Sequence, residues 1–304
     1  MEKIIACGGS PLNTYEHYLE KNGYNSKSIQ TYQRSVIRFI DWCKTYGTTA
    51  ENIDYKTFLE YIKYLRKGRL KSRTLQIYIS NLKIYFNYLI AENYRTENVI
   101  KDINIKGVKK AIIHNFLEFE ELEDLYYSYP TNKRKSLARK RNKIIIGLFV
   151  YQGLNTRDLH LLNIENIQLY KGKITIPGTR KSNTREIELK PWQLMEFMEY
   201  INEIRPQILE KTNKETEQLL VSIGSSLNLH DSIRKIAKEL KQINHKFTNV
   251  KQIRTSVIIH WLKQFNLRKT QYLTGHKYIS STEKYQQDDL ESLHETVNNF
   301  HPFS

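Results

Sequence analysis

Apolar residues recur at intervals of three and four positions through the first hundred residues, and this pattern constrains the fold more than any other feature of the chain. Such spacing places the apolar side chains on one face of a helix, and that face must be buried. Four segments show the pattern, with caps or glycines at their limits. We therefore expect a compact bundle of four helices. Their predicted limits are Pro11 and Gly23, Ile29 and Gly47, Asp54 and Gly68, and Ser72 and Leu89.

The helical pattern lapses across residues 98–113, in the stretch NVIKDINIKGVKKAII. This stretch is basic, is interrupted by a glycine and has no amphipathic period, which is typical of a linker. We therefore expect two domains, residues 1–101 and 111–304, joined by a linker at residues 102–110. Helical periodicity returns beyond it. Predicted helices cover residues 119–127, 140–151, 192–204, 229–243, 250–265 and 268–274.

One segment of the second half has the period of a β-strand. In KITIPGTRKSNTREIEL, Ile174 and Ile176 alternate with polar residues, a turn region follows, and Ile187 and Leu189 alternate again. This arrangement predicts a hairpin with Lys181 near its turn. The expected fold class is thus mainly α with a small antiparallel β-sheet.

The chain carries many more basic than acidic side chains. Its 304 residues include 48 Lys and Arg against 32 Asp and Glu, which gives a net charge of +16. A surplus of this size favours a polyanionic partner, most often nucleic acid, because each neutralised phosphate releases counterions. Charge alone leaves an anionic membrane surface and simple solubility as alternatives.

Two further classes of protein are disfavoured. No apolar run approaches the ~18 residues of a membrane span, and residues 1–11 lack the apolar core of a signal peptide, so we expect a cytoplasmic protein with no membrane partner. The only cysteines, Cys7 and Cys43, lie far apart and have no His or Cys at metal-binding spacing. We therefore expect neither a disulfide framework nor a metal, and no cofactor.

A tyrosine stands in a polar setting in the segment LTGHKYISSTEKYQQ, residues 273–287, nine residues after a Gly-His pair. The segment resembles the C-terminal signature of the tyrosine recombinase, or phage integrase, family, with His276, Thr282 and Tyr285 at matching positions. Three more segments resemble the family in the expected order. They are FLEFEEL at residues 116–122, GLNTRDLHLLNIENI at residues 153–167, and the hairpin around Lys181.

The resemblance covers nearly the whole chain and implies its architecture. The first half is similar to the helical core-binding (SAM-like) domain of the family, which binds DNA. The second half is similar to the α+β catalytic domain of tyrosine recombinases. The helical tail from residue 290 onward has an apolar stripe, and the resemblance implies that this tail docks on a neighbouring subunit of a tetramer.

The resemblance also assigns roles. Tyr285 is the expected nucleophile, which forms a 3′-phosphotyrosyl bond that stays reversible because a phenol is a good leaving group. Arg254 is the expected clamp on the phosphate, since its fork presents paired N–H donors. His276 is an expected hydrogen-bond partner of the phosphate. Lys181 is the expected general acid for the leaving 5′-oxygen, with Arg180 as its close rival.

Two positions depart from the family pattern. The arginine that follows Gly-Leu in the family is Asn155 here, and Arg157 stands two residues later. The histidine three residues before Arg254 is replaced by Lys251, which keeps a cationic donor. Either the side chain of Arg157 supplies the cationic donor that Asn155 lacks, or the enzyme is slow.

The sequence thus predicts a site-specific DNA recombinase that acts as a homotetramer on paired sites in double-stranded DNA. Such an enzyme moves or resolves mobile elements, in some cases with accessory directionality proteins. Two alternatives stay open. One is an accessory DNA-binding protein on this fold whose chemistry has decayed, and the other is a monomeric nicking-closing enzyme of the type IB topoisomerase kind.

Overall fold

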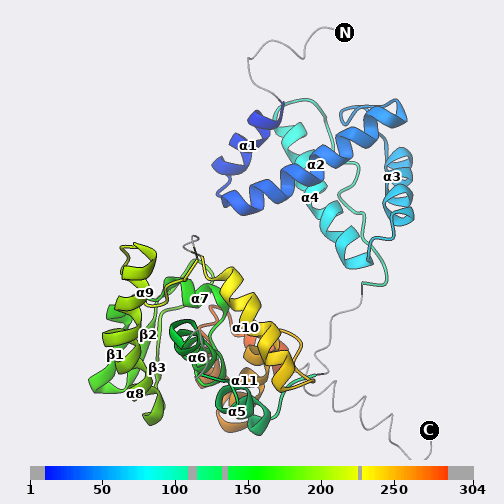
Figure 1. Cartoon of the computed structure of the whole chain (residues 1–304). Helices are drawn as coiled ribbons and strands as arrows, with labels where there is room; N and C mark the ends of the chain where they lie inside the picture. The colour runs from blue at the N-terminus through cyan, green and yellow to red at the C-terminus, as the bar shows by residue number, and fades with distance from the viewer. Residues whose placement is uncertain (1–10, 109–114, 132–135, 225–227, 287–304) are drawn as a thin grey trace, which may run out of the picture. The chain divides into compact units, whose positions relative to one another are not determined.

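The computed structural model describes residues 11–108, 115–131, 136–224 and 228–286, and it divides the chain into two compact units, Met1–Ala111 and Ile112–Ser304 (Figure 1). Each unit buries its own cluster of apolar side chains. The tail from residue 290, for which docking is expected, lies outside the described residues. Among the described helices, none is long and apolar enough to cross a membrane.

The first unit contains the four helices that periodicity predicted: α1 (Pro11–Lys21), α2 (Ser26–Tyr46), α3 (Tyr55–Lys67) and α4 (Ser72–Ala91) (Figure 1). Their apolar faces meet in an aromatic core in which Phe39 contacts Phe58, Tyr61 and Phe86. Aromatic rings bury large areas and pack edge to face, so this cluster holds three of the helices together.

Local capping sets the ends of these helices. Asp54 accepts a hydrogen bond from the backbone N–H of Thr57 and caps α3, as predicted. Gly47 ends α2 in the left-handed conformation, with φ of 75°. The predicted cap of α4 is wrong by one residue, because Lys71 occupies the N-cap position without a side-chain bond and Ser72 is the first helical residue.

The second unit begins with α5 (Phe119–Tyr127), α6 (Ser136–Val150) and the short α7 (Thr156–Leu161). After the sheet come α8 (Pro191–Glu199), a π-helical turn (Tyr200–Ile204) and α9 (Arg205–Thr212). The last helices are α10 (His230–Ile243), α11 (Val250–Gln264) and α12 (Leu267–Thr274), and residues 280–286 are again helical. The predicted helices are therefore confirmed, with end shifts of a few residues.

The hairpin is confirmed and belongs to a three-stranded antiparallel sheet. Strand β2 (Lys173–Ile176) pairs with β3 (Arg185–Glu188), so that Ile174 lies opposite Ile187. On its other edge β2 pairs with β1 (Ile167–Gln168). The sequence did not reveal β1, because two residues are too few to show an alternating pattern.

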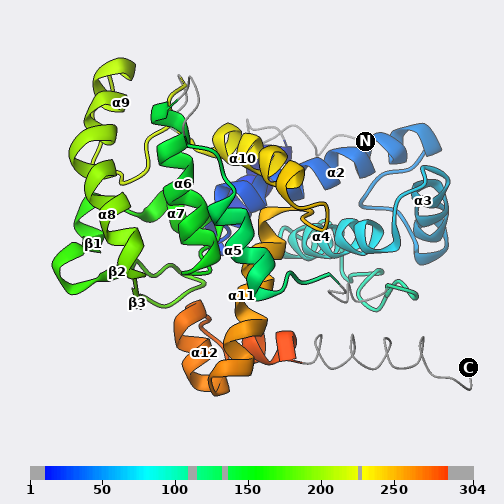
Figure 2. The ribbon, with the colours of Figure 1, turned by 60° about the horizontal axis from the view of Figure 1, so that its bottom comes forward.

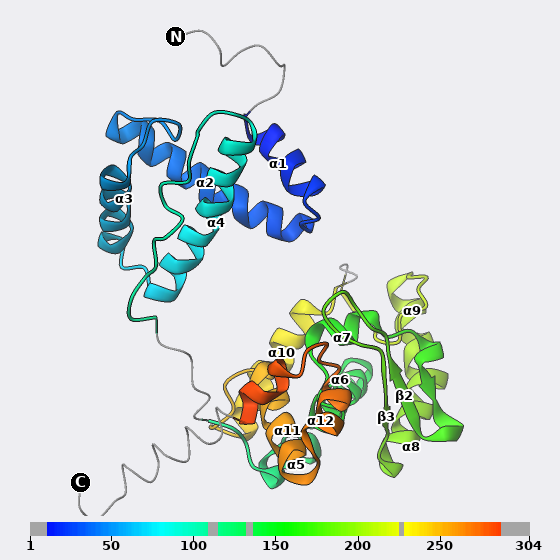
Figure 3. The same cartoon turned by 180° about the vertical axis from the view of Figure 1, so that it is seen from behind.

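Helix α6 lies at the centre of the second unit. It packs against α8 on the side of the sheet and against α5 and α11 on the other side (Figure 2). Its last two turns are almost wholly buried and include Ile145, Ile146 and Phe149. Helix α12 contacts both α11 and β3 (Figure 3), so this helix is held against the hairpin.

We expect the two units to fold separately, because each has a complete apolar core of its own. Fragments 1–111 and 112–304 should each give a cooperative thermal transition, followed by far-UV circular dichroism. Loss of the transition in either fragment, with recovery only when the two are mixed, would show instead that one core depends on the other.

Candidate active site

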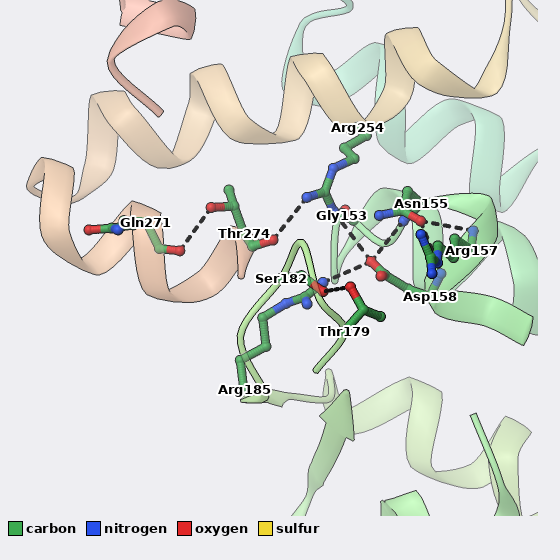
Figure 4. Close-up of polar contacts among 10 residues, drawn as sticks. All are labelled: Gly153, Asn155, Arg157, Asp158, Thr179, Ser182, Arg185, Arg254, Gln271 and Thr274. Atoms are coloured by element: carbon green, nitrogen blue, oxygen red, sulfur yellow. Dashed lines mark hydrogen bonds and ion pairs between the residues drawn. The ribbon is translucent and has the colours of Figure 1, made fainter. Parts of the chain in front are cut away.

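Four segments of the second unit converge on one point (Figure 4). They are the start of α7, the N-terminal half of α11, the turn that follows α12, and the connection between β2 and β3. Backbone hydrogen bonds join two of them directly, since the N–H of Asn183 donates to the carbonyl of Gly275 at 2.9 Å and Ser182 forms a β-bridge with His276. The predicted catalytic residues lie on or next to these segments.

Arg254 lies between α7 and the turn after α12. One guanidinium nitrogen, Nη2, donates to the carbonyl of Thr274 at 2.9 Å, and Nη1 donates to the carbonyl of Gly153. Nη1 also lies 3.6 Å from Oδ2 of Asp158. Burial lowers the pKa of Arg254, while the Asp158 carboxylate acts in the opposite direction. Two backbone carbonyls and a carboxylate therefore fix the orientation of this guanidinium.

His276 contacts two residues of the helical segment that follows it. Its Nδ1 lies 2.9 Å from the hydroxyl of Thr282, which is fully buried, and its ring stacks on that of Tyr285 with centroids 5.8 Å apart. Burial, followed by the positive charges of Arg254 and Arg185, lowers the pKa of His276 to about 4. The imidazole is therefore neutral near pH 7 and offers one N–H donor.

Tyr285 is half-buried on the helical segment 280–286, one turn after Thr282. Its ring lies nearly parallel to that of His276, with an interplanar angle of 14°. Its phenol is close enough to Arg254 to affect the pKa of that guanidinium. The expected nucleophile thus lies next to the two side chains that are expected to bind the phosphate.

Lys181 lies at the tip of the hairpin. The backbones of Thr179 and Ser182 exchange hydrogen bonds of 2.8 and 3.2 Å, which closes a turn with Arg180 and Lys181 at its two central positions. Both side chains are exposed. Since Ser182 pairs with His276, the base of this turn is fixed beside the site.

Asn155 is the N-cap of α7. Its Oδ1 accepts hydrogen bonds from the backbone N–H groups of Arg157, at 2.8 Å, and Asp158, at 3.0 Å, and Asp158 accepts one from the N–H of Asn155. The side chain of Arg157 is exposed and makes no hydrogen bond or ion pair with the described residues of the site. Lys251 is also exposed, on the first turn of α11.

Sequence reasoning missed Arg185, the first residue of β3. Its Nη2 donates to Oδ2 of Asp158 at 2.9 Å, and the two side chains are only 1% and 3% exposed. The alternation of β3 contained a signal for it, because Arg185 lies two residues before Ile187 and therefore on the same inward face of the strand. A charged residue at an inward position needs a buried partner, and Asp158 is that partner.

Two family models match the chain. Residues 12–93 match the phage integrase N-terminal SAM-like domain, and residues 115–291 match the phage integrase family. The chain is 23% identical over 297 residues to the tyrosine recombinase XerC of Oceanobacillus iheyensis, with 96% of this chain and 95% of the relative covered. It is also 23% identical to XerC of Staphylococcus aureus strain MW2 over 300 residues, with the same coverage of both chains.

Solved structures agree with these matches at the level of the fold. The XerH recombinase bound to its palindromic difH substrate superposes with a TM-score of 0.73 at 21% identity, and the alignment covers 93% of this chain and 84% of XerH. A lambda integrase dimer bound to a core site gives a TM-score of 0.61 at 18% identity, with 91% and 94% covered. The chain therefore belongs to the phage integrase family, and it is an enzyme of the tyrosine recombinase type, which breaks and rejoins DNA strands.

Proposed function

We propose that this chain recombines DNA at specific sites with Tyr285 as its nucleophile. The observation that carries the proposal is the stacking of Tyr285 on His276 next to the fixed guanidinium of Arg254. This cluster combines a phenol with two hydrogen-bond donors for phosphate oxygens. Such an arrangement suits attack on a phosphodiester, where negative charge grows on the phosphorane oxygens.

The reaction would proceed in two steps. In the first, the phenol of Tyr285 loses its proton to water and its oxygen forms a bond to phosphorus, while the bond to the 5′-oxygen breaks and Lys181 donates a proton to that oxygen. In the second, a 5′-hydroxyl attacks the phosphotyrosine and gives its proton to Lys181, while the bond from phosphorus to the Tyr285 oxygen breaks and the leaving phenolate takes a proton from water. Arg254 and His276 would donate hydrogen bonds to the phosphate in both steps, with Lys251 as an added cation at the start of α11.

The partner and the assembly follow from the same proposal. Double-stranded DNA would lie between a core-binding domain, residues 1–101, and a catalytic domain, residues 111–304, with the linker at 102–110 beside it. A solved lambda integrase assembly is a tetramer bound to a Holliday junction, and we propose a tetramer on paired sites here as well. The tail from residue 290 would then dock on a neighbouring subunit.

The biological setting is proposed on the same grounds. The enzyme would act in the cytoplasm on a mobile genetic element, in some reactions with directionality proteins. A second candidate function is an accessory DNA-binding role with little catalysis, which one observation favours: the position of the first family arginine is an uncharged helix cap, Asn155. Covalent capture of DNA separates these two candidates, and strand exchange between duplexes separates a recombinase from a topoisomerase-like enzyme.

Tyr285→Phe should abolish the covalent DNA adduct and leave DNA binding within about twofold, because only the attacking oxygen is lost. The probe is a duplex selected from a random-sequence pool for binding to the full chain, then nicked so that cleavage is trapped. Tyr278→Phe is the matched control, since Tyr278 is an exposed tyrosine of the same segment. An adduct that persists in Tyr285→Phe and disappears in another tyrosine variant would show that the other tyrosine is the nucleophile.

DNA binding should require both units, because basic residues occur throughout the chain and two linked binding modules act at high effective concentration. Fragment 112–304 should bind the selected duplex roughly tenfold or more weakly than the full chain, and the slope of log affinity against log salt should be smaller. Fluorescence anisotropy at several salt concentrations measures both quantities. Equal affinities for fragment and full chain would contradict a clamp around DNA.

His276 should make the fold less stable in acid. Its pKa is about 4 in the folded chain, against 6.5 for an ordinary histidine, so the unfolded chain binds more protons between these two values. The contribution of the neutral His276 to the free energy of unfolding is therefore fully retained above pH 6.5 and is lost as the pH falls toward 4. The groups that face the ring are Arg254, Arg185, Asp158 and Tyr285.

The measurement is the urea midpoint of wild type and His276→Gln between pH 7.5 and 4.5, because the difference isolates this one residue. Wild type should lose more stability than the variant across the range. Parallel curves for the two proteins would show that the histidine is not held neutral.

A further inference from the structure

Arg185 is a buried cation with unused hydrogen-bonding capacity. Its side chain is 1% exposed and makes one ion pair, from Nη2 to Asp158. Its Nε and Nη1 are also buried, and neither has a hydrogen-bond partner among the residues that the structure describes. Buried guanidinium donors are normally satisfied, so two unpaired donors beside the candidate site call for an explanation.

The charges of the cluster do not balance. Oδ2 of Asp158 receives Nη2 of Arg185 at 2.9 Å and lies 3.6 Å from Nη1 of Arg254, so two guanidiniums share one carboxylate oxygen. The cluster carries one excess positive charge next to His276, and the pKa of that histidine is lowered first by burial and then by the charges of Arg254 and Arg185. A buried excess of positive charge favours an anion such as a phosphate diester.

Arg185 also lies against the start of α7, where the family pattern requires a cation. Oδ2 of Asp158 accepts the backbone N–H of Asn155 at 3.2 Å as well as the Arg185 donor, so a single atom connects the two positions. The amide of Asn155 caps the helix and carries no charge. Arg185 therefore brings a guanidinium from β3 to the point where position 155 provides none.

The turn before His276 is shaped around the same guanidinium. A Cβ atom built on Gly275 would lie 2.4 Å from Nη1 of Arg185, and Gly275 has a φ of +71°. Only a glycine allows both this backbone conformation and this close approach. The guanidinium is thus enclosed between α7 and the turn that carries His276.

We propose that Arg185 is a positioning residue for phosphate cleavage, which fixes Asp158 and Arg254 from the side of β3 and supplies the buried positive charge that Asn155 does not. The proposal rests on the proposed function of the site. It differs from compensation by Arg157, whose exposed side chain makes no contact with Asp158 or Arg254 in the described residues.

The test compares single-turnover cleavage of the nicked, selected duplex by variants of the full chain. Arg185→Gln should cleave roughly 100-fold more slowly, because the loss of the buried charge and of the fixed orientation of Asp158 and Arg254 weakens a preorganised anion site. DNA affinity should change less than about threefold, since Arg185 is not on the surface. Arg185→Lys keeps the charge and should retain more of the rate.

Rescue is the decisive arm. Asn155→Arg introduced into Arg185→Gln should recover roughly tenfold or more of the rate, because a guanidinium at position 155 can pair with the vacated Asp158. Arg205→Gln is the matched control: Arg205 is also buried, and its donors meet the backbone carbonyl of Gln218. It should cleave at the wild-type rate. Arg157→Ala should have little effect.

A second readout does not depend on DNA. The pKa of His276, followed by NMR of the labelled imidazole in the free protein, should rise in Arg185→Gln and stay unchanged in Arg205→Gln. This arm also separates the two proposals. If wild type forms no adduct but the pKa of His276 still rises in Arg185→Gln, the proposed function is wrong and the electrostatic role of Arg185 stands.

Three results would overturn the proposal. Cleavage by Arg185→Gln at the wild-type rate would show that the charge of Arg185 is not needed. A loss that neither Arg185→Lys nor Asn155→Arg relieves, with an unchanged pKa of His276, would show that Arg185 only supports the fold. Loss of cleavage in Arg157→Ala alone would show that Arg157 is the compensating residue.

Discussion

The carboxylate of Asp158 is the interaction on which the rest of the site depends. It is 3% exposed, and it joins the start of α7, the first residue of β3 and the N-terminal half of α11 through one oxygen atom. Removal of one partner from a buried ion pair typically costs about 3–5 kcal/mol, because the other charge is left uncompensated. This carboxylate therefore ties the orientation of Arg254 to the packing of the hairpin.

The same arrangement determines the chemistry of the neighbouring side chains. Burial lowers the pKa of His276, and the positive charges of the two guanidiniums that share one carboxylate lower it further, to about 4. A neutral imidazole at this position can donate a hydrogen bond without adding to the charge. The positive charge of the site then resides on Arg185 and Arg254.

Asn155 shows how a departure from a family pattern can be accommodated locally. As an N-cap it satisfies two backbone N–H groups at the start of α7, a role for which asparagine is well suited and arginine is not. The first turn of α7 is therefore well formed, and Asp158 stays in place to pair with Arg185 and Arg254. This position lacks a positive charge, and Arg185 brings a buried guanidinium from β3 to the carboxylate that Asn155 also contacts.

The sequence by itself determined most of the helices and the hairpin, because helical periodicity, caps and strand alternation are local properties, whereas β1, α7 and α9 were too short to show a pattern. The four N-terminal helices and the hairpin were predicted within a few residues, and the spacing of His276 and Tyr285 identified the family. The sequence could not show that Arg185 meets Asp158, since the two are 27 positions apart and belong to no common motif. Only the tertiary structure decided that contact, because a buried charge must find its partner wherever packing brings one within reach.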